Sequence, residues 1–406
     1  MLKDILQTIV TRYLVALLNL ALIFVNARVL GIEGVGVIGL IWASISINVT
    51  VNSILGGNTL VYFSNKYPAV ILYPIAVAWI LAGSALGCGL MWLSGLLPEG
   101  YAADIYGLTV IYSIGIAQTR LLLGKDCVMG FNLTQAIQGG LLFFVVIFFY
   151  YIVHRQDVSV YVWSMYLTNG VAVIVSLCLL VPFLRAERRE AGRRRLPSIL
   201  KDMLAYGLWG SIDNMAEACT MRLNYFLVER FIGIGGVGLL DAGAKISESV
   251  WNISRSVASI EYNRIAKSRD KEEQKRITVQ LLRITLTAVS AMIICVLAVP
   301  ERIYTGYLFG PEFTGIRGVI AALSPGIVAM GCNTIFSHYF IGSGRIRYSA
   351  ASSCIGLACL LVAGWLLIPL FGITGSAASQ SIAYCFMLLF SFVIFVRINY
   401  FKTIIK

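Results

Sequence analysis

Ionisable and polar residues recur along one apolar stretch of the chain, residues 235–261. They follow one another at spacings of 4, 3, 4, 3 and 4 residues: Asp241, Lys245, Glu248, Asn252, Arg255 and Ser259. At about 100° per residue, a helix places them all on one face. The bases of this face can hold an anion, and its acids can hold a proton or a cation. We therefore predict that this face, with Lys245, Asn252 and Arg255, lines a water-filled cavity.

The acids of this stretch and of residues 204–227 are candidates for ion coupling. Asp213 and Glu217 lie one helical turn apart, and two carboxylates this close cannot both ionise in an apolar setting unless a base intervenes. Asp213, Glu217, Asp241 and Glu248 are thus predicted to bind a coupling H⁺ or Na⁺. The alternative is a network of salt bridges that only holds helices together, and the order of Asp241 and Lys245 favours such an i,i+4 pair.

Other polar residues lie at the margins of apolar stretches. Arg12 and Asn19 share one face of the first stretch and are predicted to contribute to the same cavity. Arg12 is also within reach of the membrane interface, so snorkelling to the headgroups is the competing interpretation. Arg222 projects away from the Asp213 face of its own helix, which favours snorkelling there.

These side chains are carried by a chain with the composition of a membrane protein. It has 406 residues, is 58% hydrophobic and only 13% charged, and has a mean hydropathy of +0.82. Such a chain has too little polar surface to cover itself in water, but a lipid environment accepts apolar side chains all round a helix. Twelve candidate spans lie near residues 5–27, 36–60, 70–97, 105–123, 133–153, 161–184, 204–227, 235–261, 279–299, 318–341, 347–368 and 373–396.

The distribution of basic residues predicts the orientation of these spans. Most of the 32 Lys and Arg residues lie at the termini and in the even-numbered loops, so both termini are predicted to be cytoplasmic. The basic segment 185–203 at the midpoint is expected to be a linker on the anionic inner face of the membrane. The nine cysteines show no CxxC pair or metal-binding spacing, so we predict neither a metal site nor a disulfide.

An internal repeat defines the expected architecture. Residues 28–38 read RVLGIEGVGVI and residues 230–240 read RFIGIGGVGLL, with six identities at an offset of 202. Six spans separate the two copies, so the two halves share one topology. We therefore expect an all-α polytopic membrane protein: a six-helix bundle at residues 1–184, the linker at 185–203 and a second six-helix bundle at 204–406, related as parallel repeats around a central cleft.

Three segments resemble the polysaccharide-transporter branch of the multidrug/oligosaccharidyl-lipid/polysaccharide flippase superfamily, the Wzx-type flippases. They are ARVLGIEGVGVIGL (27–40), LVERFIGIGGVGLLDAGAKISE (227–248) and IPLFGITGSAASQSIAYCF (368–386). The chain departs from that pattern where relatives often carry Gly-x-Tyr-Ser, because it has Asp241 at this position. The resemblance implies a MATE-like fold in the bacterial inner membrane.

The resemblance also implies a function. It is the transfer of a polyprenyl-diphosphate-linked oligosaccharide from the cytoplasmic to the periplasmic leaflet, for the biosynthesis of O-antigen or another surface polysaccharide. The cavity residues would then bind this substrate, with the bases offsetting the diphosphate charge: Arg12, Asn19, Lys245, Asn252 and Arg255. Glycosyltransferases and a glycan polymerase would then act beside it. An ion-coupled multidrug antiporter of the same superfamily is the alternative. Translocation needs no covalent chemistry and no GxxxxGK[ST] motif occurs, so we expect no enzymatic activity and no nucleotide or other cofactor. The basic residues lie in short loops between apolar spans, so we expect no nucleic-acid partner.

Overall fold

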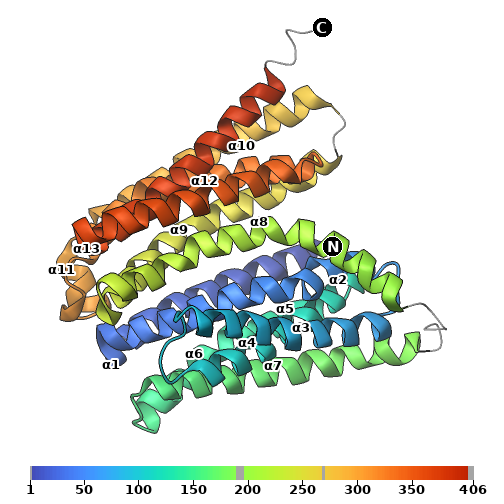
Figure 1. Cartoon of the computed structure of the whole chain (residues 1–406), viewed down its shortest axis with the longest axis horizontal. Coiled ribbons are helices and arrows are strands. Elements are labelled where there is room, and N and C mark those ends of the chain that lie inside the picture. The colour runs from blue at the N-terminus through green and yellow to red at the C-terminus, as the bar shows by residue number, and fades with distance from the viewer. Residues whose placement is uncertain (1, 189–195, 268–269, 401–406) are drawn as a thin grey trace. The chain divides into compact units, whose positions relative to one another are not determined.

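The computed structural model describes residues 2–188, 196–267 and 270–400, and this part of the chain is helical, with no strand (Figure 1). The side chains of residues 2–13 and of a few residues in α8 and α9 are outside the description. Most of the basic run in the expected linker, residues 189–195, lies outside the described residues as well. The prediction of an all-α membrane fold is confirmed.

Two very long helices are each bent at a glycine. Helix α1 (Leu2–Gly56) is interrupted at Gly31 (φ 69°), and α13 (Ile346–Asn399) is interrupted at Gly372 (φ 59°). Gly233, the repeat counterpart of Gly31, also has a positive φ, of 104°, between α8 (Leu196–Phe231) and α9 (Ile234–Lys267). A side chain with a Cβ rarely adopts this conformation, which is why glycine stands at both copies of the repeat turn.

Counting α1 and α13 twice, the described helices provide twelve long segments, each of which overlaps one predicted span. The others are α3 (Ala69–Leu93), α4 (Ala102–Gly124), the continuous run α5 to η2 (Val128–Ile152), α7 (Val158–Glu187), α8, α9, α10 (Lys271–Ala298) and α12 (Ile316–Gly342). The short α2 (Asn58–Phe63) and α11 (Glu301–Ile303) lie between long ones. Within the described residues, eight helices, α1 and α13 among them, are long and apolar enough to cross a membrane, and α8 and α9 are not among these eight. These are the two segments that carry the charged faces.

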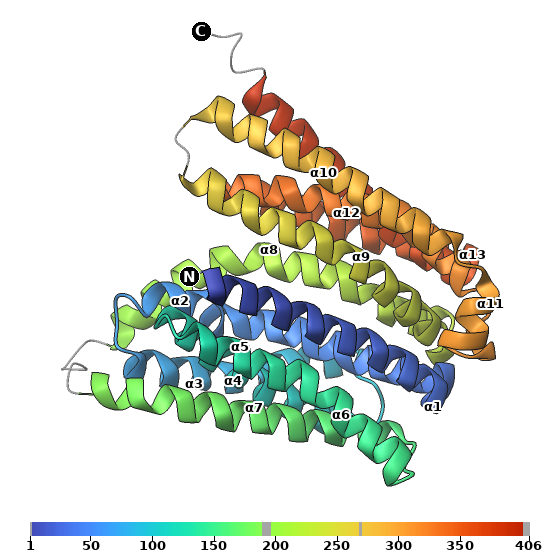
Figure 2. The same ribbon diagram turned by 180° about the vertical axis from the view of Figure 1, so that it is seen from behind.

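The chain forms two compact units. Unit 1 comprises residues 1–30 and 40–215, and unit 2 comprises residues 31–39 and 216–406. In unit 1, apolar side chains of α1 to α4, α7 and the first part of α8 form a buried core that includes Leu55, Leu72, Leu121 and Met203. In unit 2, α12 packs against α9, α10 and α13, and these helices lie side by side in both views (Figures 1 and 2).

Within unit 2 the two copies of the sequence repeat pack on each other reciprocally. A Cβ added to Gly36 would collide with the carbonyl oxygen of Ile234, and a Cβ added to Gly238 would collide with that of Ile32. Gly36 and Gly238 are 202 residues apart, and so are Ile32 and Ile234, which is the offset of the sequence repeat. Such reciprocity is what a two-fold relation between the copies produces, and it explains why both positions are glycine.

Candidate functional site

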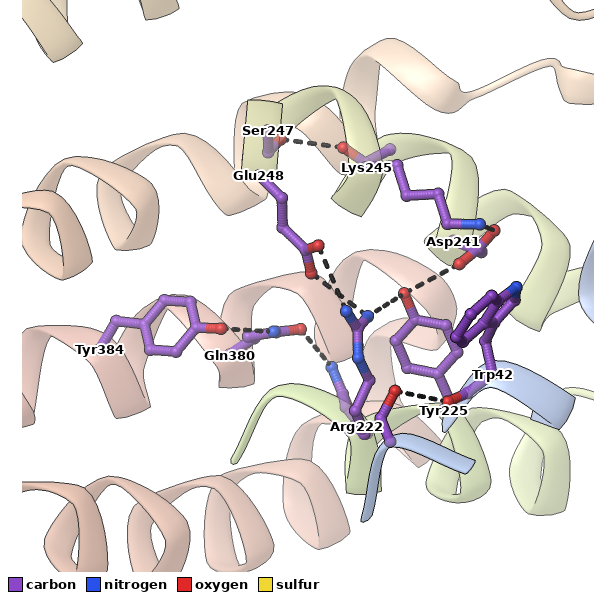
Figure 3. A network of polar contacts seen from close by, with 12 residues as sticks. Trp42, Arg222, Tyr225, Asp241, Lys245, Ser247, Glu248, Gln380 and Tyr384 are labelled. Carbon is purple, nitrogen blue, oxygen red and sulfur yellow. Dashed lines mark hydrogen bonds and ion pairs between the residues drawn. The ribbon is translucent and has the colours of Figure 1, made fainter. Parts of the chain in front are cut away.

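The polar face of α9 begins with a buried ion pair. The Nζ atom of Lys245 lies 2.8 Å from Oδ2 of Asp241, so the predicted i,i+4 pair is confirmed. Asp241 is almost completely buried, at 2% side-chain exposure, whereas Lys245 keeps 24%. The Tyr225 hydroxyl of α8 donates to the other carboxylate oxygen of Asp241 at 3.1 Å (Figure 3). One oxygen of the acid thus accepts a hydrogen bond from a hydroxyl group, and the other is in ion-pair contact with the lysine without a hydrogen bond among the described residues.

A second ion pair joins α8 to the same face. Both terminal nitrogens of Arg222 approach the carboxylate of Glu248, at 3.3 Å each. Arg222 also donates to the Tyr225 hydroxyl at 3.2 Å (Figure 3). The prediction that Arg222 snorkels to the headgroups is therefore wrong. The helical wheel located its direction relative to Asp213 correctly, but it could not show that α9 lies on that side.

These contacts form one continuous network, in the order Glu248, Arg222, Tyr225, Asp241, Lys245. Its two acids and two bases cancel. Asp241 and Glu248 were predicted to bind a coupling ion, and here each acid lies against a base instead, which favours the salt-bridge alternative for these two.

A neutral extension of the site connects α8 to α13 within unit 2. The side-chain amide of Asn224 donates to the Ser376 carbonyl at 3.1 Å and to Oε1 of Gln380 at 3.0 Å. Gln380 in turn donates to the Tyr384 hydroxyl at 2.8 Å (Figure 3). Sequence reasoning did not single out Gln380 or Tyr384, although a glutamine in the middle of an apolar span is a signal that it must find a buried partner.

The outer part of the α9 face carries the remaining predicted substrate residues. Asn252 and Arg255 are not covered by other parts of the chain within the structure. The Arg255 guanidinium lies 3.9 Å from the ring centroid of Trp251, a cation–π contact. Trp251 is itself held in place because its indole nitrogen donates to the Thr334 hydroxyl of α12 at 2.8 Å. The Arg255 guanidinium therefore packs on an aromatic ring that is itself hydrogen-bonded to α12.

The other predicted site residues lie elsewhere. Asp213 is buried and Glu217 half-buried on α8, on either side of the boundary between unit 1 and unit 2. Asn19 is exposed on α1 in unit 1, and the side chain of Arg12 is outside the described residues. In the described part of the chain, no three His, Cys, Asp or Glu side chains are grouped so that they could hold a metal ion.

Comparisons with solved structures place the fold among known membrane transporters. The chain is similar to a multidrug-resistance MATE transporter of the MOP superfamily in its inward-facing conformation, with a TM-score of 0.74, 16% identity and coverage of 96% of this chain and 95% of that one. It is also similar to the lipid II flippase MurJ in an inward closed conformation, with a TM-score of 0.70, 12% identity and coverage of 100% and 91%. The Vibrio cholerae MATE transporter VcmN gives a TM-score of 0.61 at 13% identity, with 99% of both chains covered.

No protein-family model matches the chain, and no curated protein sequence matches it. At 12–16% identity, the likeness to solved structures defines the fold and not the substrate. Together with its apolar helices, it defines the chain as a multi-pass membrane protein of the MATE/MurJ fold.

Proposed function

We propose that the protein is an alternating-access flippase that moves a polyprenyl-diphosphate-linked oligosaccharide from the cytoplasmic to the periplasmic leaflet of the bacterial inner membrane. The observation that carries the proposal is the charge of the α9 face. The Asp241–Lys245 and Arg222–Glu248 ion pairs meet on this face, and further along it the exposed Arg255 places its guanidinium over the Trp251 ring. A face of this kind favours an anionic substrate. The shared fold of the lipid II flippase MurJ supports a lipid-linked one.

The chemistry of such a substrate suits this face. The lipid tail can stay in the bilayer while the sugar–diphosphate head crosses along polar side chains. Lys245 and Arg255 are ten residues apart on one face of α9, or about 15 Å. Two bases at this separation can bind a diphosphate one after the other, so that it is not held too tightly at a single position. Arg255 can grip phosphate oxygens in a bidentate way, whereas Lys245 acts as a point charge.

Transport against a gradient requires a driving force, which we assign to H⁺ or Na⁺. Asp213 and Glu217 keep this role in the proposal because they stand one turn apart on α8 and Asp213 is buried. Changing either to its amide should abolish the dependence of transport on the ion gradient. Unchanged coupling would show that these acids serve as partners of a base.

An ion-coupled multidrug antiporter is the second candidate, favoured by the MATE fold and by the same two acids of α8. Such a protein would bind cationic drugs, for which an outward-facing arginine is unfavourable. If the protein is such an antiporter, cells from which it is deleted should lose tolerance to these drugs and keep their surface glycan.

The decisive experiment is to measure surface glycan and protein abundance in strains that carry variants of Arg255. We expect Arg255→Ala to abolish glycan export at normal abundance and Arg255→Lys to restore part of it. The matched control is Arg264→Ala, an exposed arginine nine residues further along α9 and therefore on its opposite side. Normal glycan export by Arg255→Ala, with loss of tolerance to cationic drugs, would overturn the flippase assignment in favour of the antiporter.

A further inference from the structure

One buried acid of α9 has no base beside it. Glu261 has 0% exposure, and neither of its carboxylate oxygens has a hydrogen-bond partner in the part of the chain that the structure describes. No described cation is within ion-pair distance of it, in contrast to Asp241 and Glu248. Glu261 lies twenty residues beyond Asp241, about 30 Å along the helix and on its other side. It is therefore separate from the network described above.

The carboxyl group of Glu261 lies in a polar seam between α9 and α10. The Thr278 side chain of α10 is next to it, but the Thr278 hydroxyl donates to the Gln274 carbonyl of its own helix at 2.9 Å. Ser254 of α9 is seven residues from Glu261, and Thr285 of α10 is seven residues from Thr278. Both are fully buried. Their hydroxyl oxygens also have no hydrogen-bond partner among the described residues. Over two helical turns, α9 and α10 thus each carry buried oxygens that have no hydrogen-bond partner within the described residues.

Helix α12 closes the seam. A Cβ on Gly331 would lie 2.7 Å from the Ser254 hydroxyl oxygen, so the two helices touch closely there. Seven residues further along α12 stands His338, whose ring Nδ1 is 2.9 Å from the Thr334 carbonyl. On α9 itself, Arg264 is exposed one turn beyond Glu261. On α12 Tyr339 follows His338, and its hydroxyl donates to Asn399 at 3.1 Å. On α10 the nearest charged residues are Lys275, which pairs with Glu272, and the exposed Arg276. None of these described groups forms a hydrogen bond with Glu261.

We propose that Glu261 is a proton-binding site. Among the described residues, no base is at ion-pair distance from this buried carboxyl group, and the neighbouring Thr278 hydroxyl donates to the Gln274 carbonyl. A carboxylate in such a setting is strongly disfavoured relative to the neutral acid. In the closed seam the group is therefore a carboxylic acid. When water enters between α9 and α10, the O–H bond breaks, the proton passes to water and the carboxylate becomes hydrated. The bound species is one proton, and no other reactant is needed.

If the proposed flippase function holds, this proton is a coupling proton. Glu261 lies near the end of α9 remote from the Gly233 turn. In the predicted orientation that end is cytoplasmic, so the seam would exchange its proton with the cytoplasm. The neutral acid favours the closed seam, and the ionised acid favours the open, hydrated one. A proton gradient could therefore shift the equilibrium between the closed and the open seam.

The site can be tested by chemistry that does not depend on transport. N,N′-dicyclohexylcarbodiimide reacts with protonated carboxyl groups in apolar surroundings. We expect membranes treated at neutral pH to yield a modified Glu261 peptide by mass spectrometry, with the exposed Glu272 of α10 as the unmodified internal control. Infrared spectra of the full-length protein should also contain a protonated-carboxyl band that disappears in Glu261→Gln.

Absence of both the modification and the infrared band at neutral pH would overturn the proposal. Protection of Glu261 by Na⁺ at constant pH would also overturn it, because the site would then hold a metal cation. In the transport assay, Glu261→Gln should keep normal abundance and lose the response of glycan export to collapse of the pH gradient. A labelled Glu261 in a protein whose deletion leaves surface glycan unchanged would support the proton site and refute only the flippase function.

Discussion

Replacing Lys245 by alanine tests whether the α9 ion pair is structural. The substitution leaves Asp241 at 2% exposure with no cation at 2.8 Å. Removing one partner of a buried pair costs about 3–5 kcal/mol, because the remaining charge is uncompensated. We expect a value near 3 kcal/mol, since the Tyr225 hydroxyl continues to donate to Asp241. The measurement is the free energy of unfolding of the purified protein, together with its abundance in the membrane.

A double variant separates the structural role from substrate binding. Asp241→Asn combined with Lys245→Ala removes both charges, so most of the lost stability should return. If export returns as well, Lys245 serves Asp241 and not the substrate; if stability returns without export, Lys245 contacts the diphosphate. Glu272→Gln is the control, because it breaks an exposed pair with Lys275 and should cost about 0–1 kcal/mol.

The reasoning would be refuted by a Lys245→Ala protein as stable as the wild type. Asp241 would then be neutral or solvated without its partner, which contradicts the burial on which the estimate depends. Equal losses of stability in the single and the double variant would refute it too, because the penalty would then come from lost packing of the lysine stem.

Two further predictions concern the repeat turn and the topology. Gly238→Ala places a methyl group on the Ile32 carbonyl and should destabilise the protein by about 1–3 kcal/mol, measured by thermal unfolding, whereas Gly235→Ala, whose nearest atom would be 3.9 Å away, should be neutral. Equal stability of the two variants would contradict the reciprocal packing. Reporter fusions should place residue 155 in the periplasm and residue 270 in the cytoplasm, and a cytoplasmic signal at residue 155 would refute the twelve-span topology.

Local features of this protein follow from its sequence. The twelve long helical segments could be predicted because a membrane crossing requires about 20 apolar residues in a row, and such runs can be found directly in the sequence. The Asp241–Lys245 pair could be predicted because both partners are on one helix, where a separation of four residues fixes their distance. The repeat turns could be predicted because a positive φ favours glycine, at Gly31 as at Gly233.

Contacts between helices were decided by the tertiary structure alone. A helical wheel gives the direction of Arg222 around its own axis but not which helix stands there, and Glu248 is 26 residues away on α9. The same limit hid Glu261, which is outside the polar stripe. Its isolation depends on α10 and α12 covering one side of α9, while Asn252 and Arg255 on another side stay uncovered. Burial is a property of the packed helices, and for a charged group burial decides whether it keeps its charge.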